Sequence, residues 1–299
     1  MTRFAIGIDI GGTNIKSVVV DASGNVRHEL RAETRDASDA QWKHAIRELV
    51  HNLRQQHGAP IDVIGLSAPG LANAANTAIE CMPGRLLGLE NFVWSDWIGQ
   101  QVWVLNDAHA AMTAEASFGA ARGKRHAVLP TLGTGVGGGI VIDGKLYQGL
   151  GQMAGHFGHT TVDADTHLRD VTGMAGSIEE AIGNVSVEQR THGRYKTTHD
   201  LVAAYRAGDT FATWTWLTSV RRLAMTVASA VNIISPEVVV IGGGIAQAGD
   251  ALYGPLRDFM ELYEWRPGGK STPIVPAAFS DLAGAIGAAA FALSKSDSK

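Results

Sequence analysis

Residues Ala127–Asp143 read AVLPTLGTGVGGGIVID, a glycine-rich stretch within strongly apolar sequence. Gly133, Gly135 and Gly138 match the spacing G-x-G-x-x-G of a dinucleotide-binding loop. In such a loop a helix opens at the third glycine, because the helix N-terminus receives the pyrophosphate. Here β-branched residues and an Asp143-Gly144 turn follow instead, which indicates a β-hairpin. The stretch therefore predicts two strands joined by a glycine turn whose backbone N–H groups can face an anion, and not a nicotinamide site.

The stretch Ala5–Asp21, AIGIDIGGTNIKSVVVD, lies over the first one without a gap when the chain is shifted by 122 residues. The identical positions in this match are those of Ala5, Gly11, Val19 and Asp21. Each copy predicts a buried strand, a glycine turn and a second buried strand. Two such hairpins indicate two related lobes that face each other across a cleft. The alternative is a chance match, because glycine-flanked apolar hairpins are common.

Composition sets the broad class of the protein. A chain of 299 residues, 45% hydrophobic and 18% charged, is typical of a globular protein with about two domains. A net charge of −4 offers no basic stripe for nucleic acid and no polybasic patch for a membrane. Cys81 is the single cysteine, which excludes an internal disulfide and favours the cytoplasm. The sequence shows neither a signal peptide nor an apolar run of the roughly 18 residues that a membrane span needs.

Predicted strands and helices alternate along the chain, which is the pattern of an α/β fold. An Ala-rich segment over residues 284–293 predicts a final helix that packs closely through small side chains. We expect an N-terminal lobe over residues 1–120, completed by this helix, and a C-terminal lobe over residues 121–283. The remaining residues 294–299, SKSDSK, predict a disordered tail.

Four segments in this order resemble the ROK family of sugar kinases: IDIGGTN, LNDAHAA, TLGTGVGGGIVIDGKLYQG and NIISPEVVVIGGGIAQAGD. The resemblance extends from about Phe4 to Leu293, and TLGTGVGGG followed by GKLYQG is its most specific part. It implies the actin-like ATPase superfold, in which two ribonuclease-H-like lobes have a cleft between them. It also implies ATP and Mg²⁺ as cofactors, a small-molecule sugar as substrate and a homodimer.

The resemblance assigns the phosphates of ATP to the two glycine turns. The residues concerned are Gly11, Gly12, Thr13 and Asn14 in the first lobe, and Gly133, Thr134 and Gly135 in the second. Asp9 is placed to hold Mg²⁺ through water. Lys16 adds a positive charge, with a solvated strand lysine as the alternative. Gly242, Gly243 and Gly244 fit the adenosine side, with a purely structural left-handed turn as the alternative.

Asn106-Asp107 is the predicted chemical centre. In the family this Asp is the general base and the preceding Asn binds the sugar. A carboxylate at a strand end can accept the proton of a sugar hydroxyl that attacks the γ-phosphate. Asp107 could also cap the helix that follows, and the two roles are compatible. Gly70, at the end of SAPG, would allow close approach to the sugar.

The segment Ala154–Glu180, AGHFGHTTVDADTHLRDVTGMAGSIEE, departs from the family. Related chains carry AGExGH and then CxCGxxGCxE, whose cysteines bind a structural zinc together with the histidine. Asp170, Thr172 and Ser177 stand at the cysteine positions here, and hydroxyl groups are poor zinc ligands. We therefore expect no structural zinc. The alternative is a regrouped metal site built from four side chains of this loop, namely His156, His159, His167 and Asp170.

The same segment supplies the predicted sugar contacts. His159 matches the histidine that binds zinc and touches the sugar, and Glu179 matches a sugar-binding carboxylate. His156 replaces a glutamate that accepts hydrogen bonds from sugar hydroxyls. Imidazole can donate, accept or carry a positive charge, so sugar specificity is open at this position.

These observations predict an ATP- and Mg²⁺-dependent kinase for a hexose or N-acylhexosamine, acting at the primary hydroxyl. One alternative is a sugar-binding sensor or regulator that has lost catalysis. Against it, the base, both phosphate turns and the magnesium Asp are present, and the first strand begins at Phe4 with no DNA-binding segment before it. A second alternative is a sugar kinase that uses polyphosphate.

Overall fold

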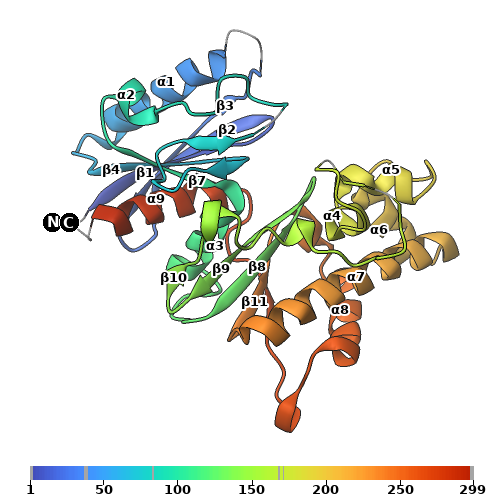
Figure 1. Cartoon of the computed structure of the whole chain (residues 1–299). Coiled ribbons are helices and arrows are strands. Elements are labelled where there is room, and N and C mark those ends of the chain that lie inside the picture. Colours follow the sequence, from blue (N-terminus) through green and yellow to red (C-terminus); the bar gives the residue numbers. More distant parts are fainter. Residues whose placement is uncertain (1–2, 37–39, 83, 168, 171, 297–299) are drawn as a thin grey trace. The chain divides into compact units, whose positions relative to one another are not determined.

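The computed structural model describes residues 3–36, 40–82, 84–167, 169–170 and 172–296. The chain forms two compact units (Figure 1). Unit 1 takes its described residues from Met1–Gly123, Leu146–Ala154 and Ala278–Lys299, and unit 2 from Lys124–Lys145 and Gly155–Ala277.

Unit 1 contains a five-stranded sheet in the order β3-β2-β1-β4-β7, together with a small hairpin and four α-helices within the described residues. The sheet strands are β1 (Phe4–Ile10), β2 (Asn14–Asp21), β3 (Val26–Glu33), β4 (Val63–Ala68) and β7 (Val102–Asn106), and the hairpin is β5 (Leu71–Ala72) with β6 (Ile79–Cys81). The helices are α1 (Gln41–His57), α2 (Trp94–Ile98), α3 (Asp107–Phe118), α9 (Ala283–Ser296) and the 3₁₀ turn η1 (Leu150–Gln152).

Side chains alternate between the two faces of β1, as they must in a strand. Ile6, Ile8 and Ile10 join Trp42 and its neighbours on α1 in one core. Ala5 lies on the other face, in a second core with residues of α9. Helices α1 and α9 therefore cover opposite faces of the sheet (Figure 1).

Helix α9 lies unusually close to the sheet, because small residues face each other. A methyl group on Gly7 would lie 1.9 Å from the carbonyl oxygen of Ala285, and one on Gly65 would lie 1.9 Å from that of Ala288. Gly7 and Gly65 are direct neighbours on β1 and β4. This close seating places the start of α9 beside Asp9, where the candidate site begins.

A second sheet repeats this order as β10-β9-β8-β11-β12, and all of it except Leu146 belongs to unit 2. The strands are β8 (Ala127–Leu132), β9 (Val136–Ile142), β10 (Lys145–Leu146), β11 (Val238–Ile241) and β12 (Ile274–Pro276). The helices are α4 (Ile178–Ile182), α5 (Val187–Arg190), α6 (Thr198–Arg206), α7 (Thr210–Ile234) and α8 (Asp250–Tyr263), with 3₁₀ turns η2 (Phe157–His159), η3 (Asn184–Ser186), η4 (Gly244–Ala248) and η5 (Pro267–Gly269). One core joins α4, α6, α7 and α8 to this sheet.

Both predicted hairpins are confirmed, since β1 pairs antiparallel with β2, and β8 with β9. The gapless match between them needs one correction. Ile10 pairs with Ile15 across the first turn, whereas Leu132 pairs with Val136 across the second. The second turn is therefore one residue shorter, and the two copies are displaced by one residue after it. The identity of Val19 with Val141 does not mark equivalent places in the two sheets.

The boundaries of the two units also differ from those expected for the two lobes. Residues 146–154 belong to unit 1, where Leu146 packs near Leu105 and Phe291. The last helix continues to Ser296, so the expected disordered tail was wrong for residues 294–296. Residues 297–299 of that expected tail lie outside the described residues. Within the described part of the chain, no helix is both long and apolar enough to cross a membrane.

Candidate functional site

Asp9 lies near the carboxyl end of β1, in register with Lys16 on β2 and with Ser67 on β4. The Ser67 hydroxyl donates a 2.7 Å hydrogen bond to Oδ1 of Asp9. A methyl group on Gly284, in the first turn of α9, would lie 2.5 Å from the same oxygen. The carboxylate is thus held between three strands and a helix N-terminus, whose dipole favours negative charge.

Burial raises the pKa of Asp9, and the hydrogen bond from Ser67 and the charge of Lys16 only partly offset this. The ammonium group of Lys16 donates a 2.8 Å hydrogen bond to the Asp281 carbonyl oxygen and lies 3.7 Å from the Asp281 carboxylate. That carboxylate opposes Lys16 and adds to the rise in the pKa of Asp9. The ammonium group of Lys16, which the sequence predicted to face phosphate, is therefore paired with Asp281 within unit 1. A hard divalent cation fits the remaining negative charge and the oxygen donors at this place.

The first glycine turn leaves two backbone donors open. The Gly11 N–H donates to the Asn14 carbonyl at 3.0 Å, and the Thr34 hydroxyl donates to the Gly11 carbonyl at 2.8 Å. The N–H groups of Gly12 and Thr13 make no hydrogen bond with any residue that the structure describes. Such a fixed turn with free donors suits an anion.

Arg85 lies against this turn and was missed by the sequence analysis. A methyl group on Gly12 would lie 2.3 Å from Nη2 of Arg85. The Leu86 N–H donates a 3.0 Å hydrogen bond to the Asp36 carboxylate, and this bond ties the arginine's segment down. Within the described residues, Arg85 has no hydrogen-bond or ion-pair partner. No sequence signal marks it, because it is far from every motif.

Asn106 and Asp107 lie where β7 ends and α3 begins. The Asn106 side-chain oxygen accepts hydrogen bonds from the N–H groups of Ala108 and His109, at 2.9 and 3.2 Å, and so caps α3. Its amide group donates to the Gly70 carbonyl at 2.9 Å. Asn106 is therefore the cap, and Asp107 is the first helical residue. One amide hydrogen of Asn106 remains for the predicted contact with sugar.

Gly70 is conformationally required, since its φ is +96° and a methyl group there would lie 2.4 Å from the Cys81 carbonyl oxygen. Loss of hydration raises the pKa of Asp107 to about 6, and the negative charge of Asp9 adds to this rise. Water nevertheless reaches the side chain, which is exposed. A carboxylate with this pKa is mostly ionised at neutral pH and still basic enough to take a proton.

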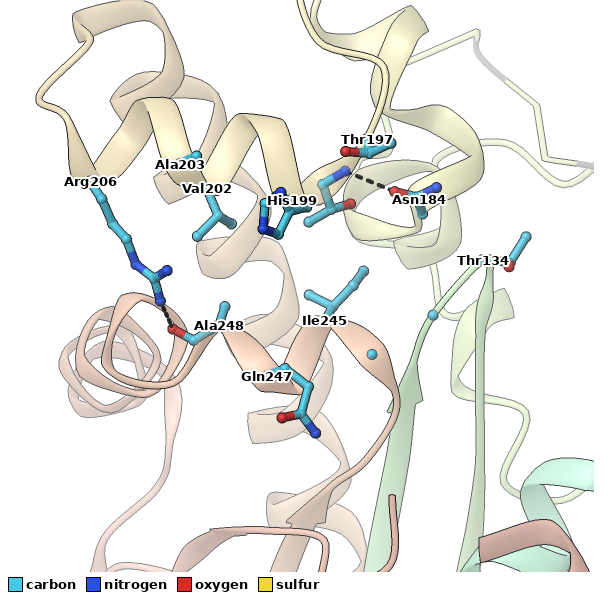
Figure 2. A pocket seen from close by; sticks show the side chains of 13 residues that line it. Thr134, Asn184, Thr197, His199, Val202, Ala203, Arg206, Ile245, Gln247 and Ala248 are labelled. Atoms are coloured by element: carbon cyan, nitrogen blue, oxygen red, sulfur yellow. Dashed lines mark hydrogen bonds between the residues drawn. The ribbon is translucent and has the colours of Figure 1, made fainter. Parts of the chain in front are cut away.

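The second glycine turn opens into a pocket of about 480 Å³ that lies wholly within unit 2 (Figure 2). Gly133 and Thr134 line it, as does Gly244 of η4. The N–H groups of Thr134 and Gly135 make no hydrogen bond with any described residue, so this turn also leaves two donors open. Its apolar walls consist of Val202 and Ala203 of α6 and Ile245 and Ala248 of η4 (Figure 2).

The three glycines after β11 have different tasks. Gly242 continues the sheet through backbone hydrogen bonds with Pro130 and Leu132. Gly243 has a φ of +86°, and a methyl group there would lie 2.2 Å from the Leu132 carbonyl oxygen. Only Gly244 lines the pocket. A structural role explains the glycine at Gly243, and the adenosine contacts of Gly242, Gly243 and Gly244 stay a prediction.

Polar residues of the pocket were missed by the sequence analysis. Asn184 accepts a 2.8 Å hydrogen bond from the Thr198 N–H, and Arg206 donates one of 2.7 Å to the Ala248 carbonyl (Figure 2). His199 and Gln247 add further polar groups to the lining. These residues come from α6, η3 and η4, and their local sequence signals only helix capping.

Glu179 links the predicted sugar contacts to the second glycine turn. Its Oε2 accepts a 2.9 Å hydrogen bond from the Val136 N–H. A methyl group on Gly135 would lie 2.2 Å from the same oxygen. The absence of a side chain at Gly135 therefore makes room for the carboxylate.

Gly138 of β9 and Gly158 of η2 allow the loop that carries His156 to lie close to the strand. A methyl group on Gly138 would lie 2.3 Å from the Phe157 ring and 2.5 Å from the Leu129 carbonyl oxygen. One on Gly158 would lie 2.1 Å from the Val136 carbonyl oxygen. The third glycine of the dinucleotide-like pattern is thus a packing position, and the loop of His156 lies directly on the strand.

The four positions that match the zinc ligands of related chains meet in unit 2. His159, Thr172 and Ser177 all interact with the carboxylate of Asp170. Hydroxyl groups are poor zinc ligands, and the carboxylate is already surrounded by donors, so these residues do not fit zinc. Among the described residues, no three His, Cys, Asp or Glu side chains are grouped to hold a metal ion, so the regrouped site including His167 is not found.

The family of this chain follows from its likeness to known proteins. The model of the ROK family matches residues 5–295. The chain belongs to the ROK family. A relative, the glucokinase of Thermotoga maritima, is 30% identical over an alignment of 307 positions, which covers 95% of each chain.

Solved ROK structures match this chain over nearly its whole length. A ROK hexokinase from Thermus thermophilus has a TM-score of 0.88 and 27% identity, with 100% of both chains covered. A ROK glucokinase from Streptomyces griseus, solved with glucose and AMPPNP, has a TM-score of 0.78 and 26% identity, covering 97% of this chain and 99% of that one. The predicted α/β fold of the actin-like ATPase superfold is confirmed by these likenesses.

Proposed function

We propose that this ROK protein is an ATP- and Mg²⁺-dependent sugar kinase with Asp107 as its general base. The observation that carries the proposal is the placement of Asp107 at the end of β7, with a pKa raised to about 6. The relationship to a glucokinase over 95% of the chain supports the reaction class.

In the proposed reaction the Asp107 carboxylate accepts the proton of a sugar hydroxyl as that oxygen attacks the γ-phosphorus of ATP. The bond to the bridging oxygen breaks and ADP leaves with its electron pair. Phosphoryl transfer needs mainly positioning and charge neutralisation, so one oriented base suffices. The primary hydroxyl of a hexose or N-acylhexosamine is the proposed acceptor, because it is the least hindered.

ATP is the proposed donor because the pocket of unit 2 has the necessary chemistry. Its apolar walls, Val202 with Ile245 among them, suit an adenine ring, and Gly133 with Thr134 lie at its edge. The open N–H groups of both glycine turns would bind phosphate oxygens. Asp9 would hold Mg²⁺ through water, and the ion, when bound, neutralises phosphate charge.

The proposed sugar contacts are Asn106 in unit 1 and His156, His159 and Glu179 in unit 2. Gly70 has a positioning role in this proposal, since its carbonyl oxygen holds the Asn106 amide. His156 should lower affinity for plain glucose compared with a glutamate-bearing relative, because a neutral imidazole has at most one acceptor atom.

A coupled ADP-release assay tests the proposal directly. The purified chain is offered a panel of hexoses and N-acylhexosamines with Mg-ATP, and the product is located by ³¹P and ¹³C NMR. We expect 6-phosphorylated sugar and ADP in equal amounts. Turnover with polyphosphate but not with ATP would show that polyphosphate is the phosphoryl donor. Sugar binding without any turnover would identify a sugar-binding sensor instead. His156→Glu in the same panel should shift the preference toward ordinary hexoses.

A further inference from the structure

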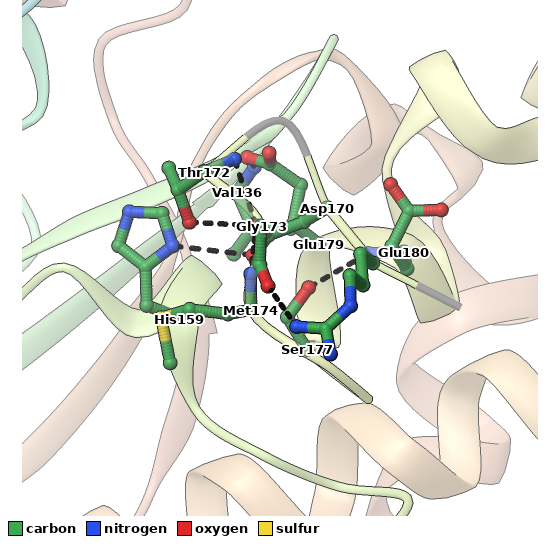
Figure 3. Close-up of polar contacts among 10 residues, drawn as sticks. Val136, His159, Asp170, Thr172, Gly173, Met174, Ser177, Glu179 and Glu180 are labelled. Carbon is green, nitrogen blue, oxygen red and sulfur yellow. Dashed lines mark hydrogen bonds and ion pairs between the residues drawn. The ribbon is translucent and has the colours of Figure 1, made fainter. Parts of the chain in front are cut away.

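Asp170 lies at the centre of a hydrogen-bond cluster in the loop between η2 and α4 (Figure 3). Its side chain has no exposed surface. Oδ1 accepts hydrogen bonds from the Thr172 hydroxyl at 2.6 Å, the Thr172 N–H at 2.9 Å and the Met174 N–H at 3.1 Å. A buried carboxylate is tolerated only when such donors replace water.

The cluster reaches both ends of the loop. Ser177 adds a hydrogen bond to the carboxylate, and its own hydroxyl caps α4 by accepting from the Glu180 N–H at 3.4 Å. Burial raises the pKa of Asp170, but the hydrogen bonds from Thr172, Met174 and Ser177 outweigh this and lower it below the ordinary range. One charged side chain thus joins His159 to three residues near the other end of the segment, namely Thr172, Met174 and Ser177.

The second oxygen of Asp170 faces His159. Oδ2 lies 3.4 Å from Nδ1 of His159, whose side chain is 37% exposed. Figure 3 shows the ring with Nδ1 toward the cluster and its other nitrogen on the far side. An ionised carboxylate only accepts hydrogen bonds, so the neutral ring must carry its proton on Nδ1. The Nε2 lone pair is then available as an acceptor.

The His159 ring also lies close to that of His156. Their centroids are 6.4 Å apart and the ring planes differ by 14°. Both rings belong to the segment that lies on the glycines of β9. A fixed orientation of the His159 ring therefore also limits how the ring of His156, the neighbouring predicted sugar contact, can lie.

We propose that Asp170 is a positioning residue, which joins His159, Thr172, Met174 and Ser177 without a metal ion and fixes His159 with Nε2 as the acceptor for a sugar hydroxyl. The sugar contact rests on the proposed function. The tautomer and the metal independence rest on the cluster alone.

Asp170→Asn separates the two oxygens of the side chain. Its amide oxygen can take the place of Oδ1 and keep the donors from Thr172 and Met174. Its NH₂ group then faces Nδ1 of His159 and donates to it, which moves the ring proton to Nε2. Thr172→Val is the matched control, because it removes one donor to Oδ1 and leaves the Oδ2–His159 contact in place.

The readouts are ¹⁵N spectra of labelled histidines, recorded about two pH units above the ordinary imidazole pKa of roughly 6.5, and calorimetric binding of glucose. We expect Nδ1–H at His159 in the natural chain and in Thr172→Val, and Nε2–H in Asp170→Asn. The dissociation constant and KM for glucose should rise about three- to tenfold in Asp170→Asn, with kcat less affected.

Nε2–H in the natural chain would overturn the proposal, even if Asp170→Asn does not fold. The proposal would also be overturned if the purified protein contained one equivalent of zinc and removal of that zinc by a chelator lowered the melting temperature. An unchanged glucose affinity in a folded Asp170→Asn with the switched tautomer would overturn the positioning role. A natural chain that carries Nδ1–H but phosphorylates no sugar would overturn the proposed function while supporting the Asp170–His159 assignment.

Discussion

The two glycine hairpins share one sheet order but differ in what they hold. In unit 1 the strands flanking the turn carry a charged pair in register, Asp9 with Lys16. In unit 2 the pair at the equivalent place is Thr131 with Gly137. The first copy brings charge to the turn, whereas the second leaves space on β9 for the loop of His156. Sheets of the same strand order thus differ through the side chains next to their turns, while each turn has two N–H groups without a partner among the described residues.

The largest expected effect concerns unit 1 and its carboxylates. Asp107→Asn should lower kcat about 10²- to 10⁴-fold, the usual contribution of a general base. Glucose affinity, measured by calorimetry, should persist. Asp96→Asn, an exposed carboxylate on α2 of the same unit, is the control and should keep full activity. Near-normal turnover in a folded Asp107→Asn variant would show that Asp107 is not the general base.

The second test concerns unit 2 and the close packing at Gly138 on strand β9. Gly138→Ala should lower the free energy of unfolding by about 1–3 kcal/mol, because the new methyl group would overlap backbone atoms that cannot move aside. Gly133→Ala is the matched control, since a methyl group there would meet nothing within 4 Å. Denaturant unfolding should show the difference. Equal stability of the two variants would mean that the loop does not lie on β9.

A pH titration sharpens the comparison further. The raised pKa of Asp107, about 6, means that the base becomes protonated as the pH falls through 6. We expect kcat/KM to decline on that acid side and to be level above it, provided that the fold is kept. In the metal-free protein, ¹³C carboxyl NMR should place the pKa of Asp107 near 6. Asp9→Asn should lower that pKa, because it removes a like charge. An unmoved value would mean that the two carboxylates do not interact.

The smallest effect is expected at Arg85. Its guanidinium lies on Gly12 but is exposed, so Arg85→Ala should raise KM for ATP by no more than about fivefold, the limit for exposed ion pairs. The effect should shrink at high salt. Arg35→Ala, an exposed arginine paired with Glu33, is the control and should leave KM unchanged. A salt-independent increase in both variants would argue against a direct contact with phosphate.

The sequence by itself determined the local elements of this protein. Short apolar runs on both sides of the turns at Gly11 and Gly133 specify hairpins, since such runs and the glycines between them are properties of the local sequence. Asn106-Asp107 marks the start of α3, although the cap is Asn106 and not Asp107, which the sequence analysis had considered. The motifs also identified the family, which the comparisons confirmed.

The tertiary structure alone decided which groups meet. Lys16 finds Asp281 at the other end of the sequence, and Arg85 finds Gly12, through contacts that no local pattern encodes. The spacing of Gly133, Gly135 and Gly138 resembled a dinucleotide-binding loop, yet Gly138 packs against Phe157 and only the turn before it has open N–H groups. The replacement of cysteines predicted a lost zinc site. It did not predict that the Asp170 carboxylate would contact His159 and Thr172, which stand at two of the other positions that match zinc ligands. Sequence periodicity reports the surroundings of a residue along one element, whereas hydrogen bonds and close packing depend on how elements distant in sequence come together.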